Sequence, residues 1–293
     1  MRITVMTPTY NRAYIIKNLY DSLKLQTFRD FEWIIIDDGS TDNTSDLVES
    51  FISESIITIH YRKVSNGGKH RAVNLGAKLA NGDLFFIVDS DDYLTSNALE
   101  LIDYYENTIP TELKNKFCGI CGLKGYNDSF AVGSTFKGET LDATILERAS
   151  FGIQGDKSEV FYTETIRRYP FPEFENEKFL TECIVWDRMA HDELKLRFFN
   201  KIIYICDYLP DGLSANSAKL FSTSPQGYAL LICQSVNYGK ISGVRKWNKY
   251  LEFYYSQRGK NSFCNISKYL KQSPVKLYLG LLGIRLFYKL YDR

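Results

Sequence analysis

Three acidic side chains lie within four residues near position 90. Asp89, Asp91 and Asp92 follow the apolar run 84–88, and such a run is typical of a strand buried on both faces. In open α/β sheets, ligands bind beyond the carboxyl ends of the strands. Clustered carboxylates repel one another unless a cation lies among them, and they suit Mg²⁺ or Mn²⁺, which usually also hold substrate phosphates. The cluster therefore indicates a metal and phosphate site, the alternative being an acidic turn that caps a following helix.

Polar loops also follow the three strands predicted before this run. They are residues 7–12, 37–42 and 66–71. Because the carboxyl ends of parallel strands meet at one edge of a sheet, a single ligand could touch all four loops. Short or apolar turns would serve stability better, so four polar loops favour a shared binding site.

Each of these loops offers a chemical role. Tyr10 could stack on a base, and Asp38 could accept a hydrogen bond from a base or a ribose. The glycines within 66–68 let the backbone approach a ligand closely. Lys69 and Arg71 lie at a predicted helix start, which favours anions, and could hold a diphosphate. The structural alternatives are turn formation by the aspartate and a solvated face for the two cations.

The elements that must position these residues alternate along the first ninety residues. Helical and strand periodicities predict strands at 3–6, 31–36, 56–61 and 84–88 and helices at 11–26, 41–52 and 70–80. Repeated strand–helix–strand units indicate a mostly parallel sheet with right-handed crossovers. Beyond residue 105 we expect strands at 117–123, 160–163 and 195–206, then helices at 177–191, 224–238, 244–256 and 274–291.

Composition and charge place the chain among globular proteins. It has 293 residues, 44% of them hydrophobic, and a net charge of +1. From residue 240 onward there are twelve basic and two acidic residues, so the tail carries +10 and the rest −9. Because this tail is also rich in Leu and aromatic residues, an anionic membrane surface is favoured as its partner over nucleic acid, which we do not expect.

The last predicted helix carries Arg285 and Lys289 on one face, as in a helix that lies in a membrane interface. The alternative is docking on the domain or on a second subunit, which would make a homodimer. No run reaches eighteen apolar residues, so we expect no transmembrane helix. No signal peptide is recognised, and we expect a cytoplasmic protein at the inner face of the cell membrane. Cys118 and Cys121 have zinc-ligand spacing but no matching second pair, so two thiols in a buried strand are favoured.

The chain resembles the family 2 glycosyltransferases, which have the Rossmann-like GT-A fold and mostly invert the anomeric centre. The matching segments are 7–12, 37–44, 66–76 and 89–92, in the order found in the family. The resemblance is strong over residues 1–105, fair to about 215 and weak beyond. It implies a nucleotide-sugar half at 1–105 and an acceptor half at 106–216. The pattern and charge of the remaining residues indicate a helical, basic, membrane-associating region at 217–293.

The resemblance also implies roles for individual residues. Asp91 would be the direct metal ligand with Asp89 beside it, and His191 or Asp211 is a candidate third ligand. Val73 stands where many relatives have Arg, and Arg71 is taken to substitute for it. The residues implied in nucleotide-sugar binding are Thr7, Pro8, Tyr10, Arg12, Asp38, Asn66, Gly68, Lys69, Arg71, Asp89 and Ser90.

The family places an acid at the start of a helix in the acceptor half, and Glu182 matches it. As general base it would take the proton from the attacking acceptor hydroxyl. Cys183 replaces the common second acid. The alternative for Glu182 is an acid stabilised by a helix dipole. Asp156 is a candidate acceptor-binding residue.

The resulting hypothesis is an inverting transferase that uses Mn²⁺ or Mg²⁺. It would move a sugar from a nucleotide-diphosphate sugar, with UDP-sugars favoured, to a lipid-linked saccharide in bacterial polysaccharide synthesis. Two alternatives are a nucleotidyltransferase and a non-catalytic nucleotide-sugar-binding scaffold. The first would have a glycine-rich, basic loop after the first strand, where this chain has residues 7–10.

Overall fold

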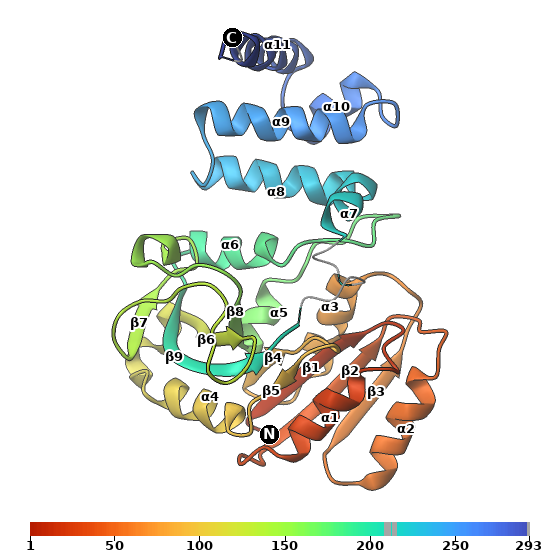
Figure 1. Ribbon diagram of the computed structural model, residues 1–293, viewed down its shortest axis with the longest axis vertical. Helices are drawn as coiled ribbons and strands as arrows, with labels where there is room; N and C mark the ends of the chain where they lie inside the picture. Colours follow the sequence, from red (N-terminus) through yellow and green to blue (C-terminus); the bar gives the residue numbers. More distant parts are fainter. Residues whose placement is uncertain (208–211, 213–215, 292–293) are drawn as a thin grey trace. The chain divides into compact units, whose positions relative to one another are not determined.

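The computed structural model describes residues 1–207, 212 and 216–291 (Figure 1). The chain forms two compact units. One comprises residues 1–172 and 188–209, and the other comprises residues 173–187 and 210–293. The second unit therefore includes a segment, 173–187, that the sequence division placed in the acceptor half.

The first unit is built on a sheet whose first four strands are parallel, as expected. These are β1 (Ile3–Thr9), β2 (Phe31–Asp37), β3 (Ile59–Lys63) and β4 (Leu84–Ile87), in the spatial order β3-β2-β1-β4. All seven residues of both β1 and β2 are buried. The continuous apolar runs thus mark strands covered on both faces.

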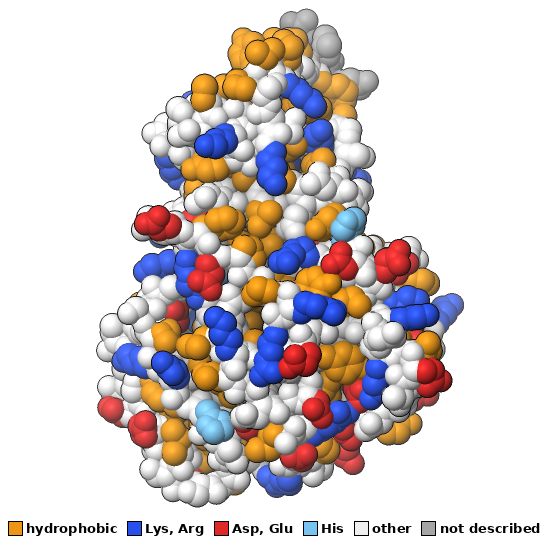
Figure 2. Space-filling model, turned by 180° about the vertical axis from the view of Figure 1, so that it is seen from behind, with side chains coloured by type: hydrophobic (Ala, Val, Ile, Leu, Met, Phe, Trp, Pro, Cys, Tyr) orange, Lys and Arg blue, Asp and Glu red, His pale blue; other side chains and the backbone are white. Residues whose placement is uncertain are grey.

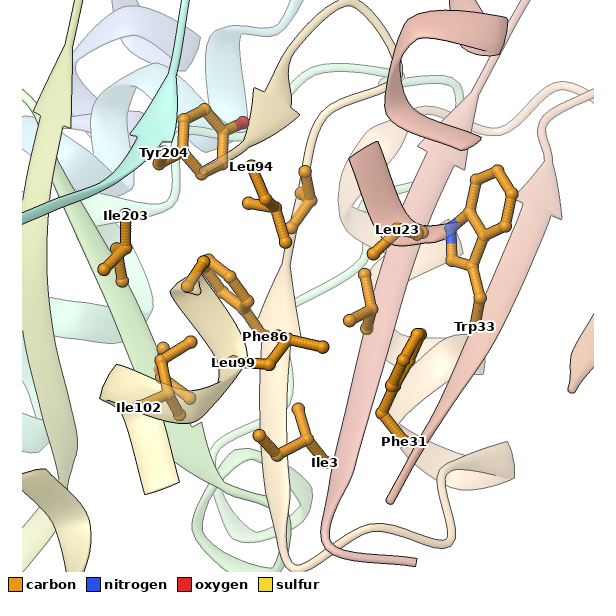
Figure 3. Packing of buried hydrophobic residues seen from close by; sticks show 14 of the residues in the cluster. Ile3, Leu23, Phe31, Trp33, Phe86, Leu94, Leu99, Ile102, Ile203 and Tyr204 are labelled. Carbon is orange, nitrogen blue, oxygen red and sulfur yellow. The ribbon is translucent and has the colours of Figure 1, made fainter. Parts of the chain in front are cut away.

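Alternate residues of these strands face different helices. Ile3, Trp33 and Phe86 belong to a cluster with the buried side chains of three helices, and Figure 3 shows Leu99 and Ile102 beside Ile3 and Phe86. On the other face, a Cβ at Gly76 would lie 2.6 Å from the Met6 side chain, so α3 (Lys69–Leu79) packs closely there. The three helices of the first face are α1 (Ile16–Lys24), α2 (Thr44–Glu54) and α4 (Ala98–Asn107).

The helix starts differ from the sequence prediction at α1. The predicted helix began at residue 11, whereas α1 begins at Ile16. Asn11 has a φ of 52°, a left-handed conformation that an α-helix does not contain. Residues 11–15 instead form the loop after β1.

The second half of the sheet makes the whole sheet mixed rather than mostly parallel. Strand β8 runs antiparallel to β4 and β6, β6 runs parallel to β9, and β5 and β7 run antiparallel to β9. Among the described residues, no α-helix lies between β6 and β8, so these two strands do not form the strand–helix–strand unit that makes neighbours parallel. The strands are β5 (Tyr93–Leu94), β6 (Phe117–Gly125), β7 (Thr140–Ala143), β8 (Lys157–Tyr162) and β9 (Lys195–Ile205). Cys118 and Cys121 are buried free thiols in β6, as expected.

The second unit is helical. Its core joins Ile232, Tyr250, Phe253, Leu277 and Leu281. Its helices are α7 (Ser217–Thr223), α8 (Pro225–Asn237), α9 (Gly243–Gln257), α10 (Phe263–Tyr269) and α11 (Pro274–Tyr291). The bounds of α11 match the prediction, and none of the described helices combines the length and hydropathy needed to cross a bilayer.

Segment 173–187 joins this unit through buried acids. The Glu177 carboxylate accepts hydrogen bonds from the backbone N–H groups of Gln226 and Gly227, at 2.7 and 2.9 Å. Asp187 forms an ion pair with Lys240 at 2.7 Å. Because Glu177 binds the N-terminus of α8, residues 177–182 stay outside the helix predicted at 177–191. That helix, α6, spans only Cys183–His191. Helix α5 of the first unit spans Thr163–Arg168.

Candidate functional site

The loops after β1 and β2 are joined directly to each other. Thr9 and Asp37, the last residues of the two strands, are partners in the parallel register. Just beyond them, the Asn11 backbone N–H donates to Ser40 Oγ at 2.8 Å, and Asn11 Oδ1 accepts from the Thr41 backbone N–H at 2.7 Å. These two hydrogen bonds join the loops after β1 and β2 into one edge.

Asp38 ties the third loop to this edge. Its two carboxylate oxygens accept hydrogen bonds from the backbone N–H groups of Gly67 and Gly68, at 2.7 and 2.8 Å. The Asn66 amide donates to the same carboxylate at 3.2 Å. Gly39, with a φ of 86°, permits the approach, because a Cβ there would lie 2.9 Å from the Asn66 nitrogen. Asp38 therefore organises the loop, and its contact with a nucleotide stays a prediction.

Cations from two of these loops contact the acidic cluster. Lys69 Nζ lies 2.5 Å from Asp89 Oδ1, and an Arg12 guanidinium nitrogen lies 3.6 Å from Asp91 Oδ2. Arg12 lies after β1, Lys69 begins α3, and the acids lie after β4. The structure thus brings together the loops of β1, β3 and β4, as the sequence predicted.

Asp92 points to a different partner. The buried Tyr204 hydroxyl donates to Asp92 Oδ2 at 2.6 Å and accepts from the Asp89 backbone N–H at 3.0 Å. Lys124 Nζ lies 4.0 Å from the centroid of the Tyr204 ring. Neither residue was predicted from the sequence. The signal was a lysine directly after the apolar run 117–123, at the end of β6.

These neighbours give the three acids different protonation behaviour. Burial would raise the pKa of Asp89, but the charges of Lys69, Lys124 and Arg12 outweigh it and hold that pKa below its ordinary value. Burial and the negative charge of Asp89 raise the pKa of Asp91. The same two causes raise the pKa of Asp92 to about 7 against the Tyr204 hydrogen bond. The carboxyls of the cluster therefore repel one another, and Asp91 and Asp92 bind protons more readily than isolated aspartates do.

The mutual repulsion of Asp89 and Asp91 fits a site for a divalent cation. Asp89 and Asp91 are half-buried and lie close enough for the charge of one to raise the pKa of the other. Among the described residues, no group of three acidic, His or Cys side chains could hold a metal alone. The site thus suits Mg²⁺ or Mn²⁺ held by one or two carboxylates and completed by substrate phosphates, not an all-protein cage. His191, exposed at the end of α6, joins no such group, and Asp211 lies outside the described residues.

The remaining residues predicted for the nucleotide site are mostly buried. The Thr7 hydroxyl accepts a hydrogen bond from Trp33 Nε1 at 2.9 Å and is fully buried. The Arg71 guanidinium donates to the Gly67 carbonyl at 2.6 Å, so it contacts its own loop. Pro8 and Ser90 are buried, and Tyr10, the first residue after β1, is 47% exposed. Their contacts with a nucleotide remain predictions.

The residues assigned to the acceptor belong to different units. Glu182 belongs to the second unit, is half-buried and directly precedes α6. Its carbonyl accepts from the backbone N–H groups of Val185 and Trp186, at 2.9 and 3.2 Å. Asp156 belongs to the first unit and is exposed just before β8. The neighbouring Lys157 anchors that strand end by donating to the Val132 carbonyl at 3.0 Å.

A sequence profile of Glycosyl transferase family 2 matches residues 4–107, which contain all four loops. Residues 4–107 belong to glycosyl transferase family 2. The match spans β1 through α4, the part of the chain where the resemblance was strongest, and it confirms the family predicted from the motifs.

Two curated relatives match the chain over 103 and 152 residues. Poly(ribitol-phosphate) beta-N-acetylglucosaminyltransferase TarS of Staphylococcus aureus is 30% identical over 152 residues, which cover 50% of this chain and 25% of that protein. Poly(ribitol-phosphate) beta-glucosyltransferase of Bacillus spizizenii is 38% identical over 103 residues, or 34% of this chain and 16% of that one. The chain therefore matches about a quarter or less of the length of these two relatives.

Solved structures resemble the chain over nearly its whole length. Residues 1–349 of S. aureus TarS with UDP-GlcNAc align with a TM-score of 0.60 at 19% identity, covering 97% of this chain and 79% of that one. A Pyrobaculum calidifontis mannosyltransferase with GDP-Man and Mn²⁺ aligns with a TM-score of 0.54 at 15% identity, covering 100% and 88%. The family 2 domain thus has the expected GT-A fold, with C-terminal helices after it.

Proposed function

We propose that this protein transfers a sugar from a nucleotide-diphosphate sugar to a saccharide acceptor. The observation that carries the proposal is the joining of the β1, β3 and β4 loops around Asp89 and Asp91 within the family 2 domain. In support, the S. aureus relative was crystallised with UDP and with UDP-GlcNAc, so a UDP-sugar is the donor we favour.

The diphosphate belongs at the acidic cluster. A divalent cation on Asp91 and Asp89 would stabilise the charge that develops on the leaving nucleoside diphosphate. The P. calidifontis mannosyltransferase was crystallised with Mn²⁺, which supports this assignment. Lys69 and Arg12 add positive charge beside the two acids, and the N-terminus of α3 favours an anion. The chain's own cations thus favour binding of the diphosphate.

Glu182 is the proposed general base. The acceptor hydroxyl oxygen attacks the anomeric carbon and forms the new glycosidic bond, while the bond from that carbon to the phosphate oxygen breaks. The hydroxyl proton passes to the Glu182 carboxylate. A single displacement of this kind inverts the anomeric centre. Asp156 is proposed to bind an acceptor hydroxyl.

The acceptor we propose is a lipid-linked saccharide in bacterial polysaccharide synthesis, at the cytoplasmic face of the membrane. The two named relatives act on poly(ribitol-phosphate), which supports a polymeric acceptor as a class.

A binding and turnover experiment tests the proposal. A thermal-shift screen of nucleotide sugars with Mn²⁺ identifies the donor, because stabilisation grows with ligand concentration over the dissociation constant. Glu182→Gln should then bind that donor normally and lose about 10²–10⁴-fold in transfer rate. Glu175→Gln, an exposed acid of the same unit, is the matched control and should keep full activity. Normal transfer by Glu182→Gln would remove it as the base, and no stabilisation by any nucleotide sugar would contradict the function.

A further inference from the structure

Helix α11 is apolar on two opposite faces. Leu277, Leu281 and Ile284 are at most 5% exposed and pack in the core of the helical unit. Gly280 permits this close packing, because a Cβ there would overlap the Trp247 ring of α9. A helix that is apolar all round normally has both faces covered, so its outer face needs an explanation.

The outer face carries a continuous row of large apolar side chains, the outer stripe, which consists of Val275, Leu279, Leu282 and Leu286. Their spacing places them on one side of the helix, and they are 69%, 60%, 42% and 51% exposed. Figure 2 shows hydrophobic side chains gathered at the top of the view, where α11 lies. Contiguous exposed apolar patches mark interaction sites rather than ordinary surface.

Exposed cations flank this stripe. The basic rim consists of Lys276, Arg285 and Lys289, and α11 contains no acidic residue. Within the described residues, no ion pair joins any of the three to an acid. Arg285 lies over the rings of Tyr254 and Tyr255, with its Cζ 5.5 and 5.2 Å from their centroids, so it stays beside the stripe.

We propose that α11 docks the protein on an anionic lipid bilayer, with the outer stripe in the interface and the basic rim at the headgroups. In such a surface the apolar stripe would contact the acyl chains, and the basic side chains would contact the anionic headgroups. A second copy of the chain fits less well, because a two-fold interface through the stripe would bring two basic rims together without acids to balance them. In this arrangement the axis of α11 lies along the bilayer surface.

This proposal rests on the proposed function only for its purpose, which is to hold the enzyme beside a lipid-linked acceptor. The docking itself is measured without donor or acceptor. Failure to bind vesicles would leave sugar transfer untouched, and failure of sugar transfer would leave docking untouched.

Flotation of the full chain with vesicles tests the docking. The protein should float with vesicles in which phosphatidylglycerol replaces about a third of the phosphatidylcholine, and should float much less with pure phosphatidylcholine. Leu279→Asp with Leu286→Asp should lower binding at least about tenfold. Lys276→Glu with Lys289→Glu should do the same and should remove the salt dependence of binding.

Matched controls change exposed residues away from α11. Phe130→Asp, at a position that is 68% exposed, and Lys201→Glu should leave flotation unchanged. Circular dichroism and a cooperative thermal transition confirm that each variant is folded. Equal binding to neutral and anionic vesicles, or no binding by the folded wild type, would overturn the proposal. So would a stable dimer in light scattering that Leu279→Asp dissociates, because it would assign the stripe to a second copy.

Discussion

Tyr204 is the residue that connects the acidic cluster to the far half of the sheet. It is buried, it donates to the Asp92 carboxyl and it accepts from the Asp89 backbone N–H. In Tyr204→Phe both groups lose their partner, and an unsatisfied buried polar group costs about 1–3 kcal/mol. We expect lower stability in urea unfolding and at least about tenfold weaker Mn²⁺-dependent UDP binding.

Tyr93→Phe is the control for that change, because Tyr93 is partly exposed in the neighbouring strand β5. It should behave as wild type in both measurements. If Tyr204→Phe is destabilised but binds UDP normally, Tyr204 supports the fold and not the site.

A second prediction at the residue scale concerns Asp38 and the loop that it holds. Its carboxylate holds the backbone N–H groups of Gly67 and Gly68, so Asp38→Ala releases the loop that begins α3. We expect UDP affinity to fall by about 1–3 kcal/mol, measured by calorimetry. An unchanged dissociation constant in a folded variant would remove both Asp38 and its loop from the nucleotide site.

At the scale of elements, Glu177 attaches segment 173–187 to α8. Its carboxylate meets two backbone N–H groups at the helix N-terminus and is 5% exposed, where the helix dipole also favours a negative charge. Glu177→Ala should destabilise the helical unit by about 1–3 kcal/mol. Tryptophan fluorescence in urea reports this, because Trp186 and Trp247 belong to that unit. Glu175→Ala, which changes an exposed acid, should leave the transition in place.

The elements that sequence predicts well are those with strong local patterns. Strands β1, β2 and β4 were predicted from runs that are apolar because both faces are buried, and the order of the four loops comes from the order of the strands along the chain. Strands β5 and β7 have two and four residues and gave no usable pattern. The contact of Tyr204 with Asp92 spans 112 positions, and such long-range pairing cannot be read from one sequence.

At the scale of the whole first unit, Glu106 joins distant parts of the chain. Its carboxylate is fully buried, accepts from Lys114 Nζ at 2.5 Å and from the Tyr162 hydroxyl at 3.0 Å, and forms an ion pair with Arg2. Burial would raise its pKa, but the hydrogen bonds from Lys114 and Arg2 outweigh it and lower the pKa below its ordinary 4.5.

A lowered pKa in the folded state stabilises the fold where the carboxyl is ionised in both states. This contribution is therefore present above pH 4.5 and is lost as the pH falls from there through the lower folded pKa. Glu106→Gln should lower the melting temperature at pH 7. Below pH 4.5, its melting temperature should fall less steeply with pH than that of the wild type. If the melting temperature of Glu106→Gln falls below pH 4.5 as steeply as that of the wild type, other carboxyls cause the fall.

The claim on which the whole account depends is that one nucleoside diphosphate binds at the strand ends through a metal on Asp89 and Asp91. Calorimetric titration of UDP with and without Mn²⁺ tests it most directly, on wild type, Asp91→Asn and the exposed-site control Asp128→Asn. We predict binding that requires Mn²⁺, persists in Asp128→Asn and weakens at least about tenfold in Asp91→Asn. UDP binding that is indifferent to both Mn²⁺ and Asp91 would contradict the account.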